Sequence, residues 1–444
     1  MEFPAGLFTD VRYESVYSTT ISFENGVLKQ NKTTLEQGAF IRVFDGRRWY
    51  YSATTDLNSV QEEIDGLAAM AAPNPDILRD PVVKRLEANR DVCLRYQDTD
   101  VSKISNVDKV AALERYLPVV QELDDVQMSV LSYFDTHTEK HIVSSLGADV
   151  TFDYQRASIH MRYTFGCGGT PFTNAQHEYR ETFAEVTDLQ DSFRKKLAED
   201  WQYAHNAVPV TPGVYTCILS PLVAGVFAHE SFGHKSESDF MIGDETMRRE
   251  WALGTRVGAE ILNIYDTGVP TGSGYVPYDD EGTKARKTYL IKDGILTGRL
   301  HSAYTAAALE EDVTGNARAV TFEFEPIVRM TSTYIGPGNQ TVEELFAGVK
   351  EGVYIQDFKH GSGMSTFTIA PNVAYRIRDG KLAEPVRIAV ITGNVMETLH
   401  KIDGLSQDWQ LCSQSTGGCG KMEQFPLRVA FGGPYVRVRD IQVQ

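Results

Sequence analysis

The 444-residue sequence has few cysteines, no long apolar run and no excess of basic residues. Its five cysteines are odd in number and irregularly spaced, which favours reduced thiols over a disulfide framework. No run approaches the roughly 18 apolar residues of a transmembrane helix, and the first residues lack the basic and apolar segments of a secretory signal. We therefore expect a cytoplasmic protein with no membrane partner.

Acidic residues outnumber basic ones by 60 to 43, which gives a formal net charge of −17. A surface with this charge repels phosphate backbones, so we expect no nucleic-acid partner. At 42% hydrophobic and 23% charged residues, the composition is that of a soluble globular protein with a large core. The length predicts two or three domains.

The first segment combines alternating strands with a helix. Two alternating runs flank Asn25-Gly26, a pair that is typical of a tight hairpin turn. Residues 56–72 place apolar side chains on one helical face, with Asp56 as the expected N-cap. We predict an N-terminal α+β domain over residues 1–95.

The middle of the chain repeats this mixture. Residues 107–123 predict a helix that is interrupted near Pro118. Alternation returns from about residue 126 and indicates three or four antiparallel strands, and residues 177–206 then predict one long helix. We predict a central α+β domain over residues 96–207.

The remaining residues, 208–444, contain many short β segments bounded by Gly, Asn and Asp. Two helical patches interrupt them, one around a pair of histidines and one at 341–352. No βαβ order repeats, which argues against a doubly wound fold. We predict a large β-rich C-terminal domain that carries the histidine helix, and an α+β class with antiparallel sheets for the whole chain.

The sequence LVAGVFAHESFGH, at 222–234, contains His229, Glu230 and His234. The usual zinc-protease helix separates its histidines by four residues, which places both on one face. Here the separation is five, and on an ideal α-helix it turns the second histidine roughly 140° away from the first. Gly233 or a one-turn π-bulge can close this angle. The pattern therefore predicts a metal site with Glu230 as general base; the alternative is a pair of structural core histidines.

A catalytic zinc site generally takes three protein ligands and leaves a fourth position open. A third ligand must therefore come from elsewhere in the chain. Spacing alone leaves several candidates open: Glu237, Asp239, Cys167 and Cys419. The flanking glycines favour Cys167 and Cys419 over the other cysteines, because they let a thiolate approach a metal without steric hindrance.

Three consecutive acids, Asp279, Asp280 and Glu281, precede a glycine. Their spacing is not that of an EF-hand, so we expect a tight turn with capping acids. Two further segments, 314–320 and 326–338, fit either substrate contacts or ordinary loops and strands.

Several motifs occur in a fixed order along the second half: HESFGH with a following DF, then DDEGT, TGN-A-R, RMTSTY, Gly and Tyr at 352–354, and finally GGCGK. In this order they resemble the TldD/PmbA metallopeptidase family, most strongly over residues 212–421. The HExxxH form is similar to that of the metal-bearing, TldD-like members.

This resemblance implies that His229, His234 and Cys419 bind zinc and that Glu230 is the catalytic base. It also implies an enzyme that hydrolyses flexible or unfolded peptides, with a zinc-activated water as nucleophile. Family members act as dimers, so the resemblance implies either a homodimer or a heterodimer with a paralogue that lacks the metal motif.

One departure from the family pattern follows GGCGK. Relatives tend to have a Gly-Gln pair there, whereas this chain has Glu423-Gln424, which predicts a changed cleft wall. Two other functions share parts of the pattern. One is a zinc hydrolase of a non-peptide amide, and the other is a non-catalytic assembly partner with structural histidines. We assign no substrate-binding residue from the sequence.

Overall fold

The computed structural model of this chain describes residues 1–363 and 365–444. Its first layer is a seven-stranded sheet in the order β3-β2-β1-β5-β6-β4, with β7 also paired to β6. All neighbours are antiparallel except β4 and β6. The strands are β1 (Phe8–Glu24), β2 (Val27–Phe44), β3 (Trp49–Thr54), β4 (Arg90–Cys93), β5 (Val126–Ser144), β6 (Asp149–Phe165) and β7 (Phe172–Arg180).

The hairpin predicted at Asn25-Gly26 is confirmed. Strand β1 ends at Glu24 and β2 begins at Val27, and both turn residues have positive φ, 47° and 80°. This left-handed backbone matches the twist of the flanking strands.

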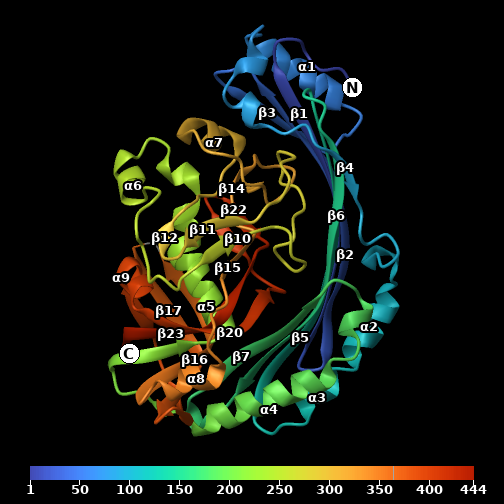
Figure 1. The fold of residues 1–444 in the computed structure, drawn as a ribbon. Coiled ribbons are helices and arrows are strands. Elements are labelled where there is room, and N and C mark those ends of the chain that lie inside the picture. Colours follow the sequence, from blue (N-terminus) through green and yellow to red (C-terminus); the bar gives the residue numbers. More distant parts are fainter. Residues whose placement is uncertain (364) are drawn as a thin grey trace.

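Helices cover both ends of this curved sheet, with α1 at one end and α2, α3 and α4 at the other (Figure 1). Apolar side chains of α1 pack on β1 and β2, and those of α3 and α4 pack on β5 and β6. The four helices are α1 (Val60–Met70), α2 (Asn106–Glu114), α3 (Leu117–Gln121) and α4 (Gln190–Asn206). The predicted interruption near Pro118 is thus confirmed.

Two helix predictions are wrong in their starts. Asp56 does not cap α1, because its carbonyl oxygen closes a turn with the Ser59 N–H and the helix begins only at Val60. Residues 177–180 are the end of strand β7 and not the start of a helix. Their alternating side chains pair with β6, as His177 does opposite His160, so sheet pairing overrides the local helical pattern.

The rest of the chain lies inside the curve of the first sheet (Figure 1). Its centre is a twelve-stranded sheet with the main order β12-β11-β10-β15-β23-β9-β16-β17-β18-β8, and β19 and β20 also pair with β23. These strands are β8 (Val208–Pro209), β9 (Gly213–Leu219), β10 (Ile264–Asp266), β11 (Thr288–Lys292), β12 (Ile295–Leu296), β15 (Ser332–Ile335), β16 (Glu351–Gly363), β17 (Thr366–Arg378), β18 (Lys381–Arg387), β19 (Ile391–Asn394), β20 (Ile402–Ser413) and β23 (Ala430–Val443).

Two small hairpins and five short helices complete this block. The hairpins are β13 (Ala317–Arg318) with β14 (Ile327–Val328), and β21 (Cys419–Lys421) with β22 (Gln424–Leu427). The helices are α5 (Pro221–Ala228), α6 (Glu245–Glu250), α7 (Ala303–Leu309), α8 (Val342–Ala347) and α9 (Val395–His400). The predicted α+β class with antiparallel sheets is confirmed. No helix in the described part of the chain is long and apolar enough to cross a bilayer.

The predicted boundary at residue 95 runs through the first sheet, since β1 to β4 precede it and β5 to β7 follow it. The boundary at residue 207 separates the strands of the two large sheets. As divisions into domains, 1–95, 96–207 and 208–444 stay predictions.

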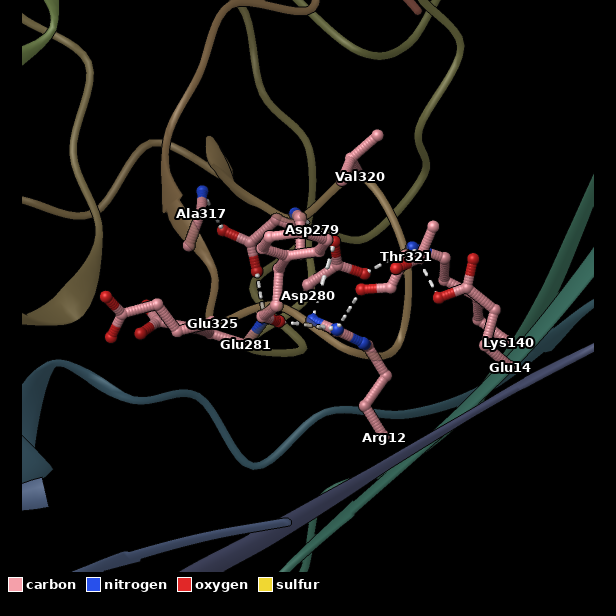
Figure 2. A network of polar contacts seen from close by, with 12 residues as sticks. Arg12, Glu14, Lys140, Asp279, Asp280, Glu281, Ala317, Val320, Thr321 and Glu325 are labelled. Carbon is pink, nitrogen blue, oxygen red and sulfur yellow. Dashed lines mark hydrogen bonds and ion pairs between the residues drawn. The ribbon is translucent and has the colours of Figure 1, made fainter. Parts of the chain in front are cut away.

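The acidic turn at 279–281 connects the C-terminal block to the first sheet (Figure 2). Asp280 lies 2.7 Å from Lys140 and 3.7 Å from Arg12, and Glu281 lies 3.0 Å from Arg42. The turn predicted from the sequence is present, because Asp279 accepts backbone N–H groups from Glu281, Thr283 and Ala317. The ion pairs to the first sheet were not predicted.

Candidate metal centre

Helix α5 leads directly into the first two residues of the site, His229 and Glu230. Ser220 caps it by accepting the Val223 N–H, and Pro221 occupies its first turn, where a missing N–H costs nothing. Its side chains are apolar and nearly all buried, so the helix is fixed on every side. It rests on β23 at two glycines, where a Cβ on Gly225 would lie 2.4 Å from the Gly432 nitrogen.

A π-helical turn over His229–Gly233 follows α5 directly, and the His234 N–H closes it on the His229 carbonyl. The wider turn absorbs the five-residue spacing and leaves the two imidazole centroids 5.1 Å apart. Gly233 is needed here, because a Cβ at this position would lie 2.1 Å from the sulfur of Met330.

Cys419 comes from the β21–β22 hairpin and faces these histidines. Its Sγ lies 3.6 Å from Nε2 of His234, and one ligand atom from each of His229, His234 and Cys419 lies within 4.8 Å of the other two. Arg329 fixes the hairpin from behind, with its Nη2 donating to the Cys419 carbonyl at 2.7 Å. The structure therefore brings together the three residues that the sequence resemblance implies.

The other candidates for a third ligand lie elsewhere. Glu237 is fully buried, and its Oε2 lies 3.2 Å from Nδ1 of His234 and 3.2 Å from Nζ of Lys421. Asp239 pairs with the same lysine at 2.6 Å. Cys167 belongs to a separate group with Asp125 and His205.

A carboxylate on Nδ1 directs Nε2 of His234 toward the thiol, and carboxylate–histidine pairs of this kind commonly support metal ligands. Sequence reasoning named Glu237 only as a possible ligand. Its position three residues after His234 is the signal that could have identified it as a partner.

Residues of the segments 314–320 and 326–338 support the hairpin from behind. Asn316 donates to the Arg329 carbonyl and to Asp266, and Asp266 also accepts the Thr331 hydroxyl. Met330, next to Arg329, packs against Gly233 as described above. Neither segment showed from its sequence alone that it would hold the cysteine.

Gln424, part of the departure from the family pattern, is also structural. Its side chain accepts the Val320 N–H at 3.0 Å and donates to the Glu325 carbonyl at 2.9 Å. Glu423 is exposed.

The charges in this centre are coupled. Burial raises the pKa of Cys419, but the charges and hydrogen bonds of His229 and His234 outweigh this effect and lower it to about 5. Burial lowers the pKa of His234, but Cys419 and Glu237 raise it to about 10. Both pKa shifts favour a thiolate beside an imidazolium, and a metal ion bound at the ring nitrogen would replace its proton.

Glu230 faces a different environment. Burial is the main influence and raises its pKa, while the two histidines act in the opposite direction. Two glycines of β16 lie against it, since a Cβ on Gly361 would be 3.4 Å from Cγ of Glu230 and one on Gly363 would be 3.0 Å from its carbonyl oxygen. A buried carboxylate with a raised pKa suits proton transfer near neutral pH.

These residues fit a metal ion. Nδ1 of His229 is buried and lacks a hydrogen-bond partner among the described residues, so this ring has a nitrogen that no protein group engages. Two imidazoles and a thiolate form a donor set that suits zinc. The remaining buried carboxylate, Glu237, is already engaged by His234 and Lys421.

Comparison with known families agrees with this geometry. Residues 212–444 match the model of the PmbA/TldA metallopeptidase C-terminal domain, and residues 9–72 match that of the PmbA/TldA metallopeptidase domain 1. The chain belongs to the TldD/PmbA metallopeptidase family. It is 31% identical to a metalloprotease of Synechocystis sp., over 98% of this chain and 94% of that protein.

A second relative of this TldD/PmbA member is a zinc metalloprotease TldD homolog of Saccharolobus solfataricus. The two are 28% identical over 98% of this chain and 96% of that protein. The fold is similar to that of TldE from Thermococcus kodakarensis, with a TM-score of 0.76 and 17% identity over 98% of this chain and 96% of the other.

Proposed function

We propose that the chain is a zinc-dependent metallopeptidase in which His229, His234 and Cys419 hold the metal and Glu230 is the general base. The main support is the convergence of three ligand atoms within 4.8 Å, although 185 residues separate His234 from Cys419. A general base next to a ligand favours a catalytic site, because a purely structural zinc needs no base.

Each residue has a defined task. A bound zinc ion would polarise the peptide carbonyl and lower the pKa of water toward neutrality. Glu230 accepts the proton from the attacking water and then delivers it to the leaving amine. The Glu237 carboxylate accepts a hydrogen bond from Nδ1–H of His234, which holds the proton on Nδ1 and keeps Nε2 available as a ligand.

We propose an extended, flexible peptide as substrate. Strand β16 passes directly beside Glu230, and its glycines leave the backbone close to the base. An extended peptide that adds to a strand binds through main-chain hydrogen bonds and places few demands on side chains. We expect broad sequence tolerance and no cleavage of stably folded proteins.

Zinc per chain, measured by elemental analysis on protein purified without chelator, tests the ligand set. We expect about one zinc in the native chain, the content of a single three-ligand site, and a large loss in Cys419→Ser. Cys412→Ser is the matched control, because Cys412 is half-buried on β20 and lies outside the ligand group. Full zinc in Cys419→Ser would overturn the assignment.

A digest of a peptide library with the zinc-loaded native chain tests the reaction. Cleavage of many unstructured peptides supports the proposal. Hydrolysis confined to non-peptide amides would instead favour that alternative, and retained zinc without any hydrolysis would favour an assembly partner.

Assembly as a homodimer, or as a heterodimer with a metal-less paralogue, stays a prediction. Light scattering of the purified chain, alone and with such a paralogue, distinguishes the two.

A further inference from the structure

A cavity of about 280 Å³ lies between the first sheet and the C-terminal block. Strands β1, β5, β6 and β7 form one wall, and residues 272–276, 318–322 and 426–428 form the other. It lies next to the metal centre without including it, because Leu427 lines the cavity and is paired with Cys419 across the β21–β22 hairpin.

Three arginines line this cavity: Arg156, Arg318 and Arg428. Arg156 donates to the Thr136 hydroxyl and the Ser415 carbonyl. Arg318 donates to the carbonyls of Met330 and Arg428, and Arg428 donates to the carbonyl of Gly417.

These contacts neutralise no charge. In the part of the chain that the structure describes, none of the three guanidinium groups forms an ion pair with a carboxylate. Two carboxylates on the cavity wall, Glu14 and Asp280, are already engaged by Lys140, and a third, Glu36, is exposed. The arrangement stands out in a chain with a net charge of −17.

Arg318 is buried and Arg156 and Arg428 are half-buried, and holding guanidinium groups together with little water around them is costly unless an anion accompanies them. Burial is the main cause of the lowered pKa of Arg428, which falls to about 9, and the nearby charge of Arg156 adds to it. A bound oxyanion would remove this repulsion, and the planar fork of arginine donors matches a carboxylate in geometry.

The apolar part of the cavity lining indicates what kind of molecule the anionic group belongs to. Apolar and aromatic side chains make up much of the lining, among them Phe152, Phe322, Leu427 and Tyr179. A free inorganic ion would leave these surfaces unused, whereas an amino-acid residue with its own side chain would cover them.

We propose that this cavity binds a carboxylate of a peptide, held by Arg156, Arg318 and Arg428 while neighbouring peptide atoms pack on the apolar walls. Naming a peptide as the carrier rests on the proposed peptidase function, but the binding step itself needs no hydrolysis. The carboxylate is either the C-terminus of the peptide or an acidic side chain.

Binding to the full-length, zinc-loaded Glu230→Gln chain tests this without cleavage. The probes are four forms of one short fluorescent peptide: with a free C-terminus, with an amidated C-terminus, and each of these with an internal Glu replacing Gln. We expect a carboxylate-bearing form to bind at least about tenfold more tightly than the amidated, Gln-containing form, since one charge-assisted hydrogen bond contributes this factor. Comparing the free with the amidated C-terminus tests the C-terminal carboxylate, and comparing the Glu with the Gln forms tests an acidic side chain.

Adding Arg428→Gln should remove this preference, and Arg428→Lys should retain part of it. Arg194→Gln is the control, because Arg194 is half-exposed and lies outside the cavity. Thermal melts of all variants identify any that fail to fold, and Arg156→Gln then provides the second test.

Equal binding of all four peptides by the Glu230→Gln chain with its three arginines unchanged would overturn the inference, even if the native chain shows zinc-dependent hydrolysis. Displacement by inorganic phosphate with no preference among the peptides would also overturn it. A carboxylate preference without any hydrolysis by the native chain would support the inference and count against the proposed peptidase.

Discussion

The acidic turn at 279–281 and the metal centre both bury several charges, but the carboxylates of the turn and the imidazole of His229 differ in how fully their atoms are paired. In the turn, all six carboxylate oxygens accept a backbone N–H or a basic side chain. In the metal centre, a buried nitrogen of His229 has no partner among the described residues. We infer that a cluster with saturated carboxylates stabilises the fold, whereas a centre with an unpaired ring nitrogen is arranged for a ligand.

Among substitutions in the two clusters, we expect the largest effect on activity from a change at Glu230 in the metal centre. Glu230→Gln should lower kcat/KM for peptide hydrolysis by about 10²- to 10⁴-fold, the usual contribution of a general base, while zinc content stays unchanged. Parallel peptide assays and elemental analysis measure both quantities. Hydrolysis at the native rate would remove Glu230 from the mechanism. In the native enzyme, the rate should fall on the acid side, with a midpoint above the ordinary carboxyl pKa because burial raises it.

The saturated cluster should respond in stability and not in zinc binding. Asp280→Ala removes the carboxylate that pairs with the buried Arg12 and leaves the buried Lys140 only its longer contact with Glu14, and breaking a buried pair in this way typically costs about 3–5 kcal/mol. Urea unfolding measures the loss. Asp76→Ala is the control, because its ion pair with Arg79 is exposed and should cost less than about 1 kcal/mol. Equal losses in the two variants would contradict the structural role of the turn.

Glu237 shares features of both clusters, because it is buried and paired like the carboxylates of the turn, yet it supports a ligand of the metal centre. Glu237→Gln keeps the shape but weakens the hold on Nδ1 of His234, so zinc affinity should fall about 10- to 100-fold. Competition with a chelator measures it. Asp239→Asn is the matched control, since Asp239 pairs with Lys421 and not with a histidine. An unchanged zinc affinity in Glu237→Gln would show that His234 needs no orienting partner.

The smallest effect is expected at Gly233. Gly233→Ala forces a Cβ against the sulfur of Met330, and overpacking of this kind costs about 1–3 kcal/mol. Met330→Ala in the same chain should restore part of the stability. Thermal unfolding of the two single variants and the double variant measures the coupling. Strictly additive losses would mean that the contact with Met330 does not explain the glycine.

The sequence predicted the parts of this site that are local. The five-residue spacing in HESFGH required a widened turn, and the structure has a π-helical turn there. Alternation identified the first strands and the Asn25-Gly26 hairpin, because period and turn chemistry are properties of neighbouring residues. The third ligand was different, since spacing left four candidates open and only the resemblance singled out Cys419.

The contacts that could not be predicted from the sequence join residues that are far apart in the chain. The motif segments 314–320 and 326–338 support Cys419 through Asn316 and Arg329, which lie far before it in the chain. Ion pairs from Asp280 and Glu281 reach strands near the other end of the chain. Such contacts depend on topology, and no local period encodes them.

The packing of α5 on β23 has a consequence for the order in which the site can form. Gly225 and Gly432 bring the histidine helix into backbone contact with this strand, and β23 spans Ala430–Val443. The ribosome therefore adds the support for the helix after both histidines and the cysteine have been made. A nascent chain that already has the three candidate ligands still lacks the strand on which their helix packs.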